Sequence, residues 1–337
     1  MFVKYDEIEN TYRKKTIEEL KSKSEPTDIF VVTEKIHGMN FSFIIDSKNE
    51  IQMATRNNVI TVNENSIENK LLQQYKNNLL KLVQLIKNRY PQIITVQIYG
   101  ELFGGKYNNK SEGRRIQKGV EYIPFNDIMF FDIRVETLNG SYFLPFVEVE
   151  ELINKSDLKL VPIIYKGNLE NCLNYDTNFL TTIPKLYNLP DIEGNICEGV
   201  VIRPYNNDIL NVYGRRILLK NKNDKFAEKQ RAPKRKRKNN VELSEDNQEL
   251  INDILEYATE NRLNNVISKG IDVDFKNFSI ISKAFIDDIF KDFQKDYDLP
   301  ESLEILLKQE PSILKIVKNE INAIVRNYIK NDLGVLK

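Results

Sequence analysis

The chain has 337 residues, which is too long for one small core and predicts one large domain or two moderate ones. Hydrophobic residues make up 41% and charged residues 29%, as in an ordinary globular protein. Lysine plus arginine equals aspartate plus glutamate, 49 each, so net charge indicates no partner. Any nucleic-acid site must come from local clustering of charge.

The chain contains only two cysteines, and their positions bear on metal sites, disulfides and the cellular compartment. Cys172 and Cys197 form no C-x-x-C motif or Cys/His cluster, so the sequence predicts neither a zinc site nor a disulfide framework. No apolar run approaches membrane-spanning length, and the first residues carry charges where a signal peptide needs an apolar core. We therefore expect a soluble protein of a reducing compartment, the cytoplasm, or the host cytoplasm if the chain is viral, with no membrane contact.

The first element of interest surrounds Lys35. Residues 29–32 and 41–46 are short apolar runs typical of strands, so residues 35–40 are expected to connect them tightly. Gly38 supplies backbone freedom or room for close approach to a ligand. A lysine on such a connection can lose part of its hydration and become nucleophilic, which makes Lys35 the candidate nucleophile. Alone, Lys-x-x-Gly is more often a solvated lysine in a turn.

The next elements bring charged residues to strand ends. Residues 51–56 continue the strand pattern as far as Arg56, and residues 68–90 have the three-four spacing of an amphipathic helix that ends before a proline. A strand over 93–105 ends with Glu101 among glycines. The strand over 128–133 contains Asp132, and a carboxylate there is costly to bury unless it is paired or used.

Two later strands complete the set. Residues 197–204 place Glu198 and a glycine before a buried strand, with Arg203 near its end. Residues 217–222 end in Lys220 and Lys222, whose spacing of two directs both ammonium groups to one side. Two cations on one face favour an anion, although a solvent-facing sheet edge gives the same pattern.

The chain changes character after residue 228. Lysine and arginine dominate residues 229–240, which predicts a flexible basic linker that could also contact RNA phosphates. From residue 244 the apolar spacing is helical, including the stretch after Pro311. The expected domains are therefore residues 1–228, a linker over 229–240, and an all-helical domain over 241–337.

A nucleophilic lysine, carboxylates at strand ends and paired cations are what nucleotidyl transfer requires. In their order along the chain, the blocks resemble the bacteriophage T4 RNA ligase 2 type of ATP-dependent RNA ligase, a covalent nucleotidyltransferase. The matching blocks cover residues 34–38, 100–101, 116–118, 131–133, 198–204 and 220–223, with 241–244 and 261–269 in the carboxyl-terminal part.

The resemblance implies an α+β fold, with a nucleotidyltransferase domain of antiparallel sheets flanked by helices and a smaller all-α domain after it. It implies roles for several groups of residues. The nucleophile that carries AMP would be Lys35, and Glu198, Lys220 and Lys222 would complete the catalytic set. ATP contacts would come from Glu34 (through its backbone), Ile36, His37, Asn40, Arg56, Glu101, Phe131 (stacked on adenine), Asp132, Arg203, Lys220 and Lys222. A metal would be held by Glu198 and Asp132, and RNA would be bound by Arg56, Arg262 and Asp288.

The resemblance further implies ATP as co-substrate, Mg²⁺ or Mn²⁺ as metal, and a monomer that seals 3′-hydroxyl/5′-phosphate nicks in duplex RNA or an RNA/DNA hybrid. The like charges of Lys220, Lys222 and magnesium would lower the pKa of Lys35. Two departures stand out: Arg203 occupies a position that is usually lysine, and residues 65–67 lack an aromatic pair that the family carries.

Three other functions fit parts of the pattern. A capping guanylyltransferase or a DNA ligase shares the amino-terminal chemistry, but both normally continue into a small β-barrel, whereas residues 244–330 have helical periodicity. A catalytically silent RNA-binding protein that uses the basic linker would not need the acid and lysine set intact.

Overall fold

A computed structural model describes residues 2–61, 63–227, 245–268, 270–297, 299 and 301–332. The contacts divide the chain into two compact units, Met1–Asn223 and Asp224–Lys337. The basic linker that the sequence predicts over 229–240 lies outside the described residues, so the predicted domain limits stay a prediction. Among the helices that the structure describes, none is both long and apolar enough to cross a membrane.

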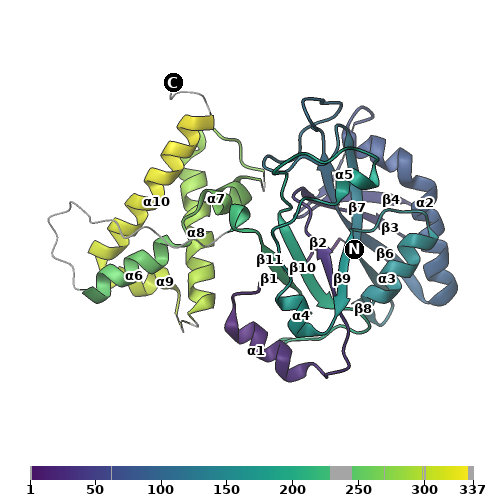
Figure 1. The fold of residues 1–337 in the computed structure, drawn as a ribbon, viewed down its shortest axis with the longest axis horizontal. Coiled ribbons are helices and arrows are strands. Elements are labelled where there is room, and N and C mark those ends of the chain that lie inside the picture. Colours follow the sequence, from purple (N-terminus) through teal and green to yellow (C-terminus); the bar gives the residue numbers. More distant parts are fainter. Residues whose placement is uncertain are drawn as a thin grey trace. The chain divides into compact units, whose positions relative to one another are not determined.

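The first unit contains two sheets, as Figure 1 shows. The smaller has five strands in the order β1-β11-β10-β2-β9. Its strands are β1 (Glu9–Asn10), β2 (Phe30–Glu34), β9 (Ile163–Gly167), β10 (Gly199–Pro204) and β11 (Leu219–Lys222). The short β1 runs parallel to β11, and the other pairs are antiparallel. Because β10 lies between β2 and β11, the ends of three predicted motif strands are adjacent in space.

The second sheet is antiparallel throughout, with six strands in the order β5-β4-β3-β6-β7-β8. These are β3 (Met39–Ile45), β4 (Ile51–Thr55), β5 (Val59–Ile60), β6 (Ile93–Gly104), β7 (Asn126–Thr137) and β8 (Gly140–Phe143). The predicted mixed fold with antiparallel sheets is therefore confirmed.

The connection between β2 and β3 joins the two sheets and does not form a hairpin within one of them. Gly38 lies on this connection against β6, where a Cβ atom would stand 2.3 Å from the Leu102 carbonyl oxygen and 2.9 Å from Cγ of Glu101. A glycine is needed because the backbone of β6 approaches closely, and this close approach brings the segment after Lys35 next to Glu101.

Helices cover each sheet. α2 (Ile67–Arg89) and α3 (Phe146–Lys155) pack beside the six-stranded sheet, and the Ser66 side chain caps α2 by accepting a bond from the Asn69 amide (Figure 1). α2 agrees with the amphipathic helix that the sequence predicts over residues 68–90. Against the five-stranded sheet pack α1 (Lys14–Lys23) and α4 (Leu169–Leu173). A short helix, α5 (Ile183–Leu186), follows.

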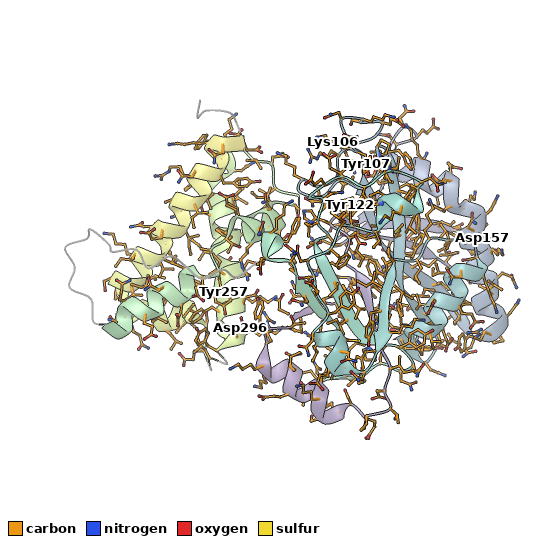
Figure 2. The ribbon with its side chains drawn as sticks, viewed as in Figure 1. Lys106, Tyr107, Tyr122, Asp157, Tyr257 and Asp296 are labelled. Carbon is orange, nitrogen blue, oxygen red and sulfur yellow. The ribbon has the colours of Figure 1, made fainter. Side chains whose placement is uncertain are left out.

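The described residues of the second unit form helices only. They are η1 (Asp224–Phe226), α6 (Glu245–Leu255), α7 (Glu260–Ile267), η2 (Phe275–Asn277), α8 (Phe278–Asp296), α9 (Leu303–Lys308) and α10 (Pro311–Asp332). Their apolar faces enclose one core, and the buried Tyr257 directs its hydroxyl to Asp296, donating to Oδ2 over 2.6 Å (Figure 2). The helical periodicity of the sequence predicted an all-helical region after residue 244, with helices near α6, α7 and α10, each of which buries its apolar stripe.

Gly199 offers a test of how β10 is held beside β11. Its φ is +149°, and a Cβ there would lie 2.2 Å from the Asn221 carbonyl oxygen. We expect Gly199→Ala to lower the free energy of unfolding by about 1–3 kcal/mol through strain and disturbed strand pairing. Gly140→Ala is the matched control, since Gly140 has a φ of +140° but open space where the added methyl group would lie, with nothing within 4 Å. Urea titration of both variants checks this, and equal losses would contradict it.

Candidate active site

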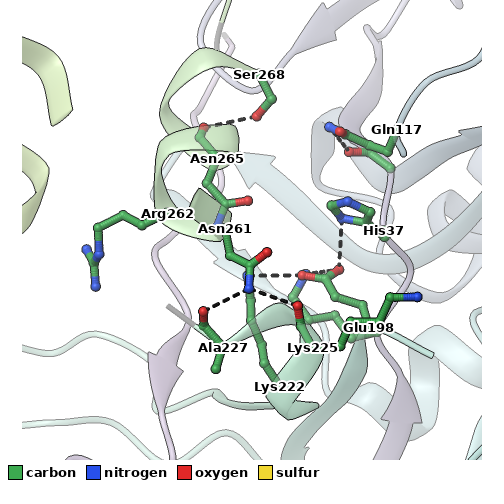
Figure 3. Close-up of polar contacts among 12 residues, drawn as sticks. His37, Gln117, Glu198, Lys222, Lys225, Ala227, Asn261, Arg262, Asn265 and Ser268 are labelled. Carbon is green, nitrogen blue, oxygen red and sulfur yellow. Dashed lines mark hydrogen bonds and ion pairs between the residues drawn. The ribbon is translucent and has the colours of Figure 1, made fainter. Parts of the chain in front are cut away.

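Glu198 lies at the centre of a cluster of cations just before β10. Its Oε2 is 2.7 Å from Nζ of Lys35 and 3.5 Å from Nδ1 of His37, and its Oε1 is 3.1 Å from Nζ of Lys222. Figure 3 shows His37 and Lys222 directed at this carboxylate. The Glu198 side chain is only 2% exposed. Residues from distant parts of the sequence therefore meet at one carboxylate.

The cations decide the charge state of Glu198. Burial alone raises the pKa of its carboxyl, but the positive charges of Lys35 and Lys222, with a smaller contribution from His37, outweigh that effect and hold the pKa well below its usual value. Glu198 is therefore an anion at neutral pH, with cations on both of its oxygens.

Backbone bonds fix the segments that carry these side chains. The Lys35 amide donates to the Gly199 carbonyl over 2.9 Å, and the Asn223 amide donates to the Glu198 carbonyl over 2.9 Å. On the other side, the Gln117 amide group donates to the Gly38 carbonyl over 3.2 Å, a contact drawn in Figure 3. The positions of Lys35 and Glu198 thus follow from strand pairing and from the turn around Gly38.

Glu101 contributes from the second sheet. Its Oε1 accepts a bond from the Gly38 amide over 3.2 Å, and Asn40 is its partner in the register of β3 and β6. Desolvation by burial raises the pKa of the Glu101 carboxyl to about 7, although the charges of Lys35 and Arg56 act in the opposite direction. Three of the predicted ATP contacts, Asn40, Arg56 and Glu101, are therefore brought to the region of the predicted nucleophile Lys35.

Glu34 and Ile36, on either side of Lys35, are turned into the protein. Glu34 is 1% exposed, and its carboxylate accepts bonds from the Thr181 hydroxyl and from the amide and hydroxyl of Thr182. Burial raises the pKa of the Glu34 carboxyl, and these bonds lower it only in part. Ile36 is also buried. A contact from Glu34 to a nucleotide would have to come from its backbone, as the resemblance implies.

Lys220 lies on β11 two residues before Lys222, opposite Val201 of β10 and Asn10 of β1. Its side chain is partly exposed, and that of Lys222 is 8% exposed. The spacing along the strand agrees with the sequence prediction that both side chains share a side of the sheet.

Asp132 and Arg203 belong to a different cluster from that of Glu198. Asp132 Oδ2 lies 3.2 Å from Nη1 of Arg203 and 2.9 Å from Nη2 of Arg216, and it accepts a bond from the Tyr5 hydroxyl over 2.7 Å. Burial by itself raises the pKa of the Asp132 carboxyl, but the two guanidinium groups have the larger effect, so the pKa lies below its usual value. Two arginines and Tyr5 thus hold the Asp132 carboxylate, and the roles of Asp132 as a metal ligand and of Arg203 as an ATP contact stay predictions.

This second cluster holds Phe131. The Phe131 carbonyl accepts a bond from Arg203 Nη1 over 3.1 Å, and the ring of Tyr5 meets the Phe131 ring edge to face with centroids 5.1 Å apart. The sequence analysis identified neither Tyr5 nor Arg216. An arginine directly before the buried run 217–219 was the available signal for Arg216, whereas no pattern around Tyr5 pointed to it.

The two residues of the second unit that were predicted to bind RNA, Arg262 and Asp288, form an ion pair with each other. Arg262 is 1% exposed, and its Nη1 lies 2.8 Å from Asp288 and 2.7 Å from Asp292. A guanidinium buried against two carboxylates of α8 joins α7 to α8, and this argues against a phosphate contact by Arg262. Asp288 is the anionic partner in the same pair, so it too has a structural explanation.

The described residues contain no group of three or more His, Cys, Asp or Glu side chains that could hold a metal ion. Magnesium commonly takes one or two carboxylates and completes its shell with water and substrate phosphates. Glu198 fits that role as a single anionic ligand, because it lies 2.7 Å from Nζ of the candidate nucleophile Lys35.

The raised pKa of Glu101 predicts a pH dependence of stability. The folded state keeps this proton up to about pH 7, whereas the unfolded chain loses it near 4.5, so stability falls as pH rises between these values. Glu101→Gln has no carboxyl group to titrate at this position, so it does not lose stability in this way as pH rises. We expect the variant to gain about 1–3 kcal/mol over wild type between pH 5 and pH 8. Urea titrations across this range measure the difference, and a constant difference would contradict the assignment.

Comparison with known proteins adds two family matches. Residues 28–222 match the family model for RNA ligase, and residues 241–328 match the model for the T4 RNA ligase 2 C-terminal domain. The first match contains Lys35, His37 and Lys222, whose side chains approach the Glu198 carboxylate, and it includes more than half of the chain.

Individual relatives are more distant. The mitochondrial RNA-editing ligase 2 of Trypanosoma brucei brucei is 28% identical over 231 residues, which are 60% of this chain and 55% of that protein. Two solved structures of the Naegleria gruberi RNA ligase, one with pyrophosphate and one a mutant with ATP and manganese, are each 17% identical with a TM-score of 0.44. Each alignment covers 67% of this chain and 57% of the other. The chain thus spans little more than half the length of these relatives.

Proposed function

The chain belongs to the RNA ligase family, of the T4 RNA ligase 2 type, and from this premise we propose that it joins RNA ends at the expense of ATP. The observation that carries the proposal is the arrangement of Lys35, Glu198 and Lys222 within the matched region. A primary amine stands there beside a buried carboxylate and a second cation, on segments that two sheets fix. These are the parts that covalent nucleotidyl transfer needs.

In the first step, Nζ of Lys35 attacks the α-phosphorus of ATP. The new N–P bond forms as the bond to the β-phosphate oxygen breaks, and pyrophosphate leaves. The amine must first give up a proton and separate from Glu198, 2.7 Å away, because an ammonium group has no lone pair for attack. Lys220 and Lys222 then lie on the strand next to Glu198, where their charges can stabilise the phosphate oxygens.

A divalent metal fits this proposal at Glu198, with Mg²⁺ or Mn²⁺ completing its shell from ATP and water. It would supply positive charge to the phosphate oxygens and the departing pyrophosphate. Glu198 is the described carboxylate nearest to the nucleophile, and its strongly lowered pKa keeps it in the anionic form that a metal requires.

In the later steps, AMP passes from Lys35 to an RNA 5′-phosphate, and a 3′-hydroxyl attacks that activated phosphate and expels AMP. We propose nicked duplex RNA as the substrate and a monomer as the active form. The match of residues 241–328 to the T4 RNA ligase 2 C-terminal domain supports this choice over other RNA ends.

The other enzymes with this chemistry fit less well. DNA ligases and capping enzymes normally continue into a small β-barrel. The described residues of the second unit, 224–227 and 245–332 with short gaps, include helices and no strand. An RNA-binding protein without catalytic activity would not need Glu198 to be buried between two lysines, so this arrangement favours an enzyme.

We expect Lys35→Ala to abolish covalent labelling of the protein by radiolabelled ATP, because the attacking amine is gone. The same variant should still join an RNA supplied already adenylylated at its 5′ end, since only the first step uses that amine. Lys155→Ala is the control, because Lys155 is an exposed lysine on α3 that pairs with Glu151. GTP should give no label with any of these proteins.

Two results would contradict this assignment. Labelling of Lys35→Ala would place the nucleophile elsewhere. Failure of that variant on adenylylated RNA, with circular dichroism unchanged, would mean that Lys35 is needed beyond the first step.

We expect Lys222→Ala to slow adenylylation by about a hundredfold or more, because it removes a preorganised cation from the phosphate site. Glu198→Ala should be similarly damaging, since Lys35 and Lys222 lose their shared partner. The control is Lys166→Ala, which breaks a lysine–glutamate pair with Glu150 outside the site. Single-turnover labelling measures the rates, and near-wild-type rates in the two site variants would exclude this site.

A further inference from the structure

The hairpin between β10 and β11 exposes apolar side chains that nothing in the proposed chemistry uses. At its tip Tyr213 is 85% exposed and Val212 is 75% exposed, and Leu210 beside them is 47% exposed. A fully exposed tyrosine at a hairpin tip forgoes the burial that normally stabilises an aromatic side chain. The question is whether the tip is a loose turn or a built surface.

The tip is an ordered turn, because several of its backbone amides donate hydrogen bonds. The Asn211 amide donates to the Arg215 carbonyl over 2.7 Å, and the Asn211 side chain accepts bonds from the amides of Tyr213 and Arg215, both over 3.0 Å. Gly214 supplies the left-handed residue of the turn, with a φ of +72°. These bonds fix the direction in which Tyr213 leaves the hairpin.

Contacts on both sides hold the hairpin to the first unit. From α1, Glu19 accepts a bond from the Val212 amide over 2.7 Å, and Lys23 donates to the Leu210 carbonyl over 2.7 Å. At the base, Arg216 pairs with Asp132 and lies over the Phe143 ring, 3.4 Å from its centroid. A rigid support of this kind lowers the entropic cost of binding at the tip.

We propose that this tip, formed by Leu210, Val212, Tyr213 and Arg215, binds an unpaired RNA base by stacking on Tyr213. The size of the surface favours a base over a protein partner. One aromatic side chain buries roughly 150–250 Å², whereas each partner of a stable protein interface buries about 800 Å². The choice of RNA rests on the proposed function.

The charges around the tip agree with RNA. Arg215 is exposed two residues after Tyr213, and α1 next to the hairpin carries four lysines and two glutamates; Lys21 is exposed, whereas Lys23 pairs with Glu19. An exposed aromatic ring beside cations is the usual arrangement for single-stranded nucleic acid, where the ring stacks on a base and the cations balance phosphates. β11 follows this hairpin in the chain and ends at Lys222.

The test is the affinity of the full chain for a fluorescently labelled single-stranded RNA, measured by anisotropy. We expect Tyr213→Ala to weaken binding by about 5- to 100-fold, as loss of one stacked base does, and Tyr213→Phe to bind like wild type. Leu138→Ala is the matched control, because Leu138 is 90% exposed at another hairpin of the same unit. It should also bind like wild type, as should all variants with blunt duplex RNA.

Three outcomes would overturn the proposal. They are unchanged affinity in Tyr213→Ala, equal weakening in Tyr213→Phe, or equal weakening toward blunt duplex. Sedimentation tests a second copy of the chain as the occupant, and a wild-type dimer that Tyr213→Ala dissociates would also overturn the proposal. Labelling of Lys35 by ATP is followed in parallel. If ATP does not label the wild-type protein, the proposed function is wrong. If ATP labels it normally while Tyr213→Ala binds RNA unchanged, only the proposed role of the tip is wrong.

Discussion

The burial of one carboxylate between two lysines is the constraint on which the rest of the site depends. Glu198 cannot be buried as an anion without nearby cations, and Lys35 and Lys222 come from strands on either side of β10. Strand order and electrostatics therefore require each other: the sheet β11-β10-β2 places the lysines, and the ion pairs stabilise the ends of those strands. Gly199 is part of the same arrangement, because only a residue without a Cβ fits beside Asn221.

Two clusters of buried charge in the first unit, around Glu198 and around Asp132, differ in the cations that surround the carboxylate. Around Glu198 the cations are lysines, whose compact ammonium groups can exchange a carboxylate for a phosphate. Around Asp132 they are Arg203 and Arg216, whose rigid, always charged groups suit a permanent pair. The replacement of the usual lysine by Arg203 is understandable in this setting, since a guanidinium can contact Asp132 and the Phe131 carbonyl together.

The two sheets also set different conditions for their acids. Glu198 has cations at both oxygens and stays ionised, while Glu101 accepts a single backbone bond from Gly38, and burial raises its pKa to about 7. Two carboxylates with pKa values so far apart can act differently at neutral pH, one as a permanent anion and the other as a group that can hold a proton. Lys35 lies on the segment between β2 and β3, which connects the two sheets. This segment brings Glu198 and Glu101 into the same site.

The sequence by itself determined the local elements and the residues with unusual chemistry. Apolar periodicity predicted α2, the strands that carry Lys35, Glu101 and Lys222, and the helices after residue 244, because period and end signals are local properties of the chain. Only the tertiary structure decided which charges meet. It pairs Asp132 with two arginines and buries Arg262 against Asp288 and Asp292, at positions where the family resemblance implies a metal ligand and an RNA contact. These outcomes depend on which sheets and helices face each other, and no spacing along the chain encodes that directly.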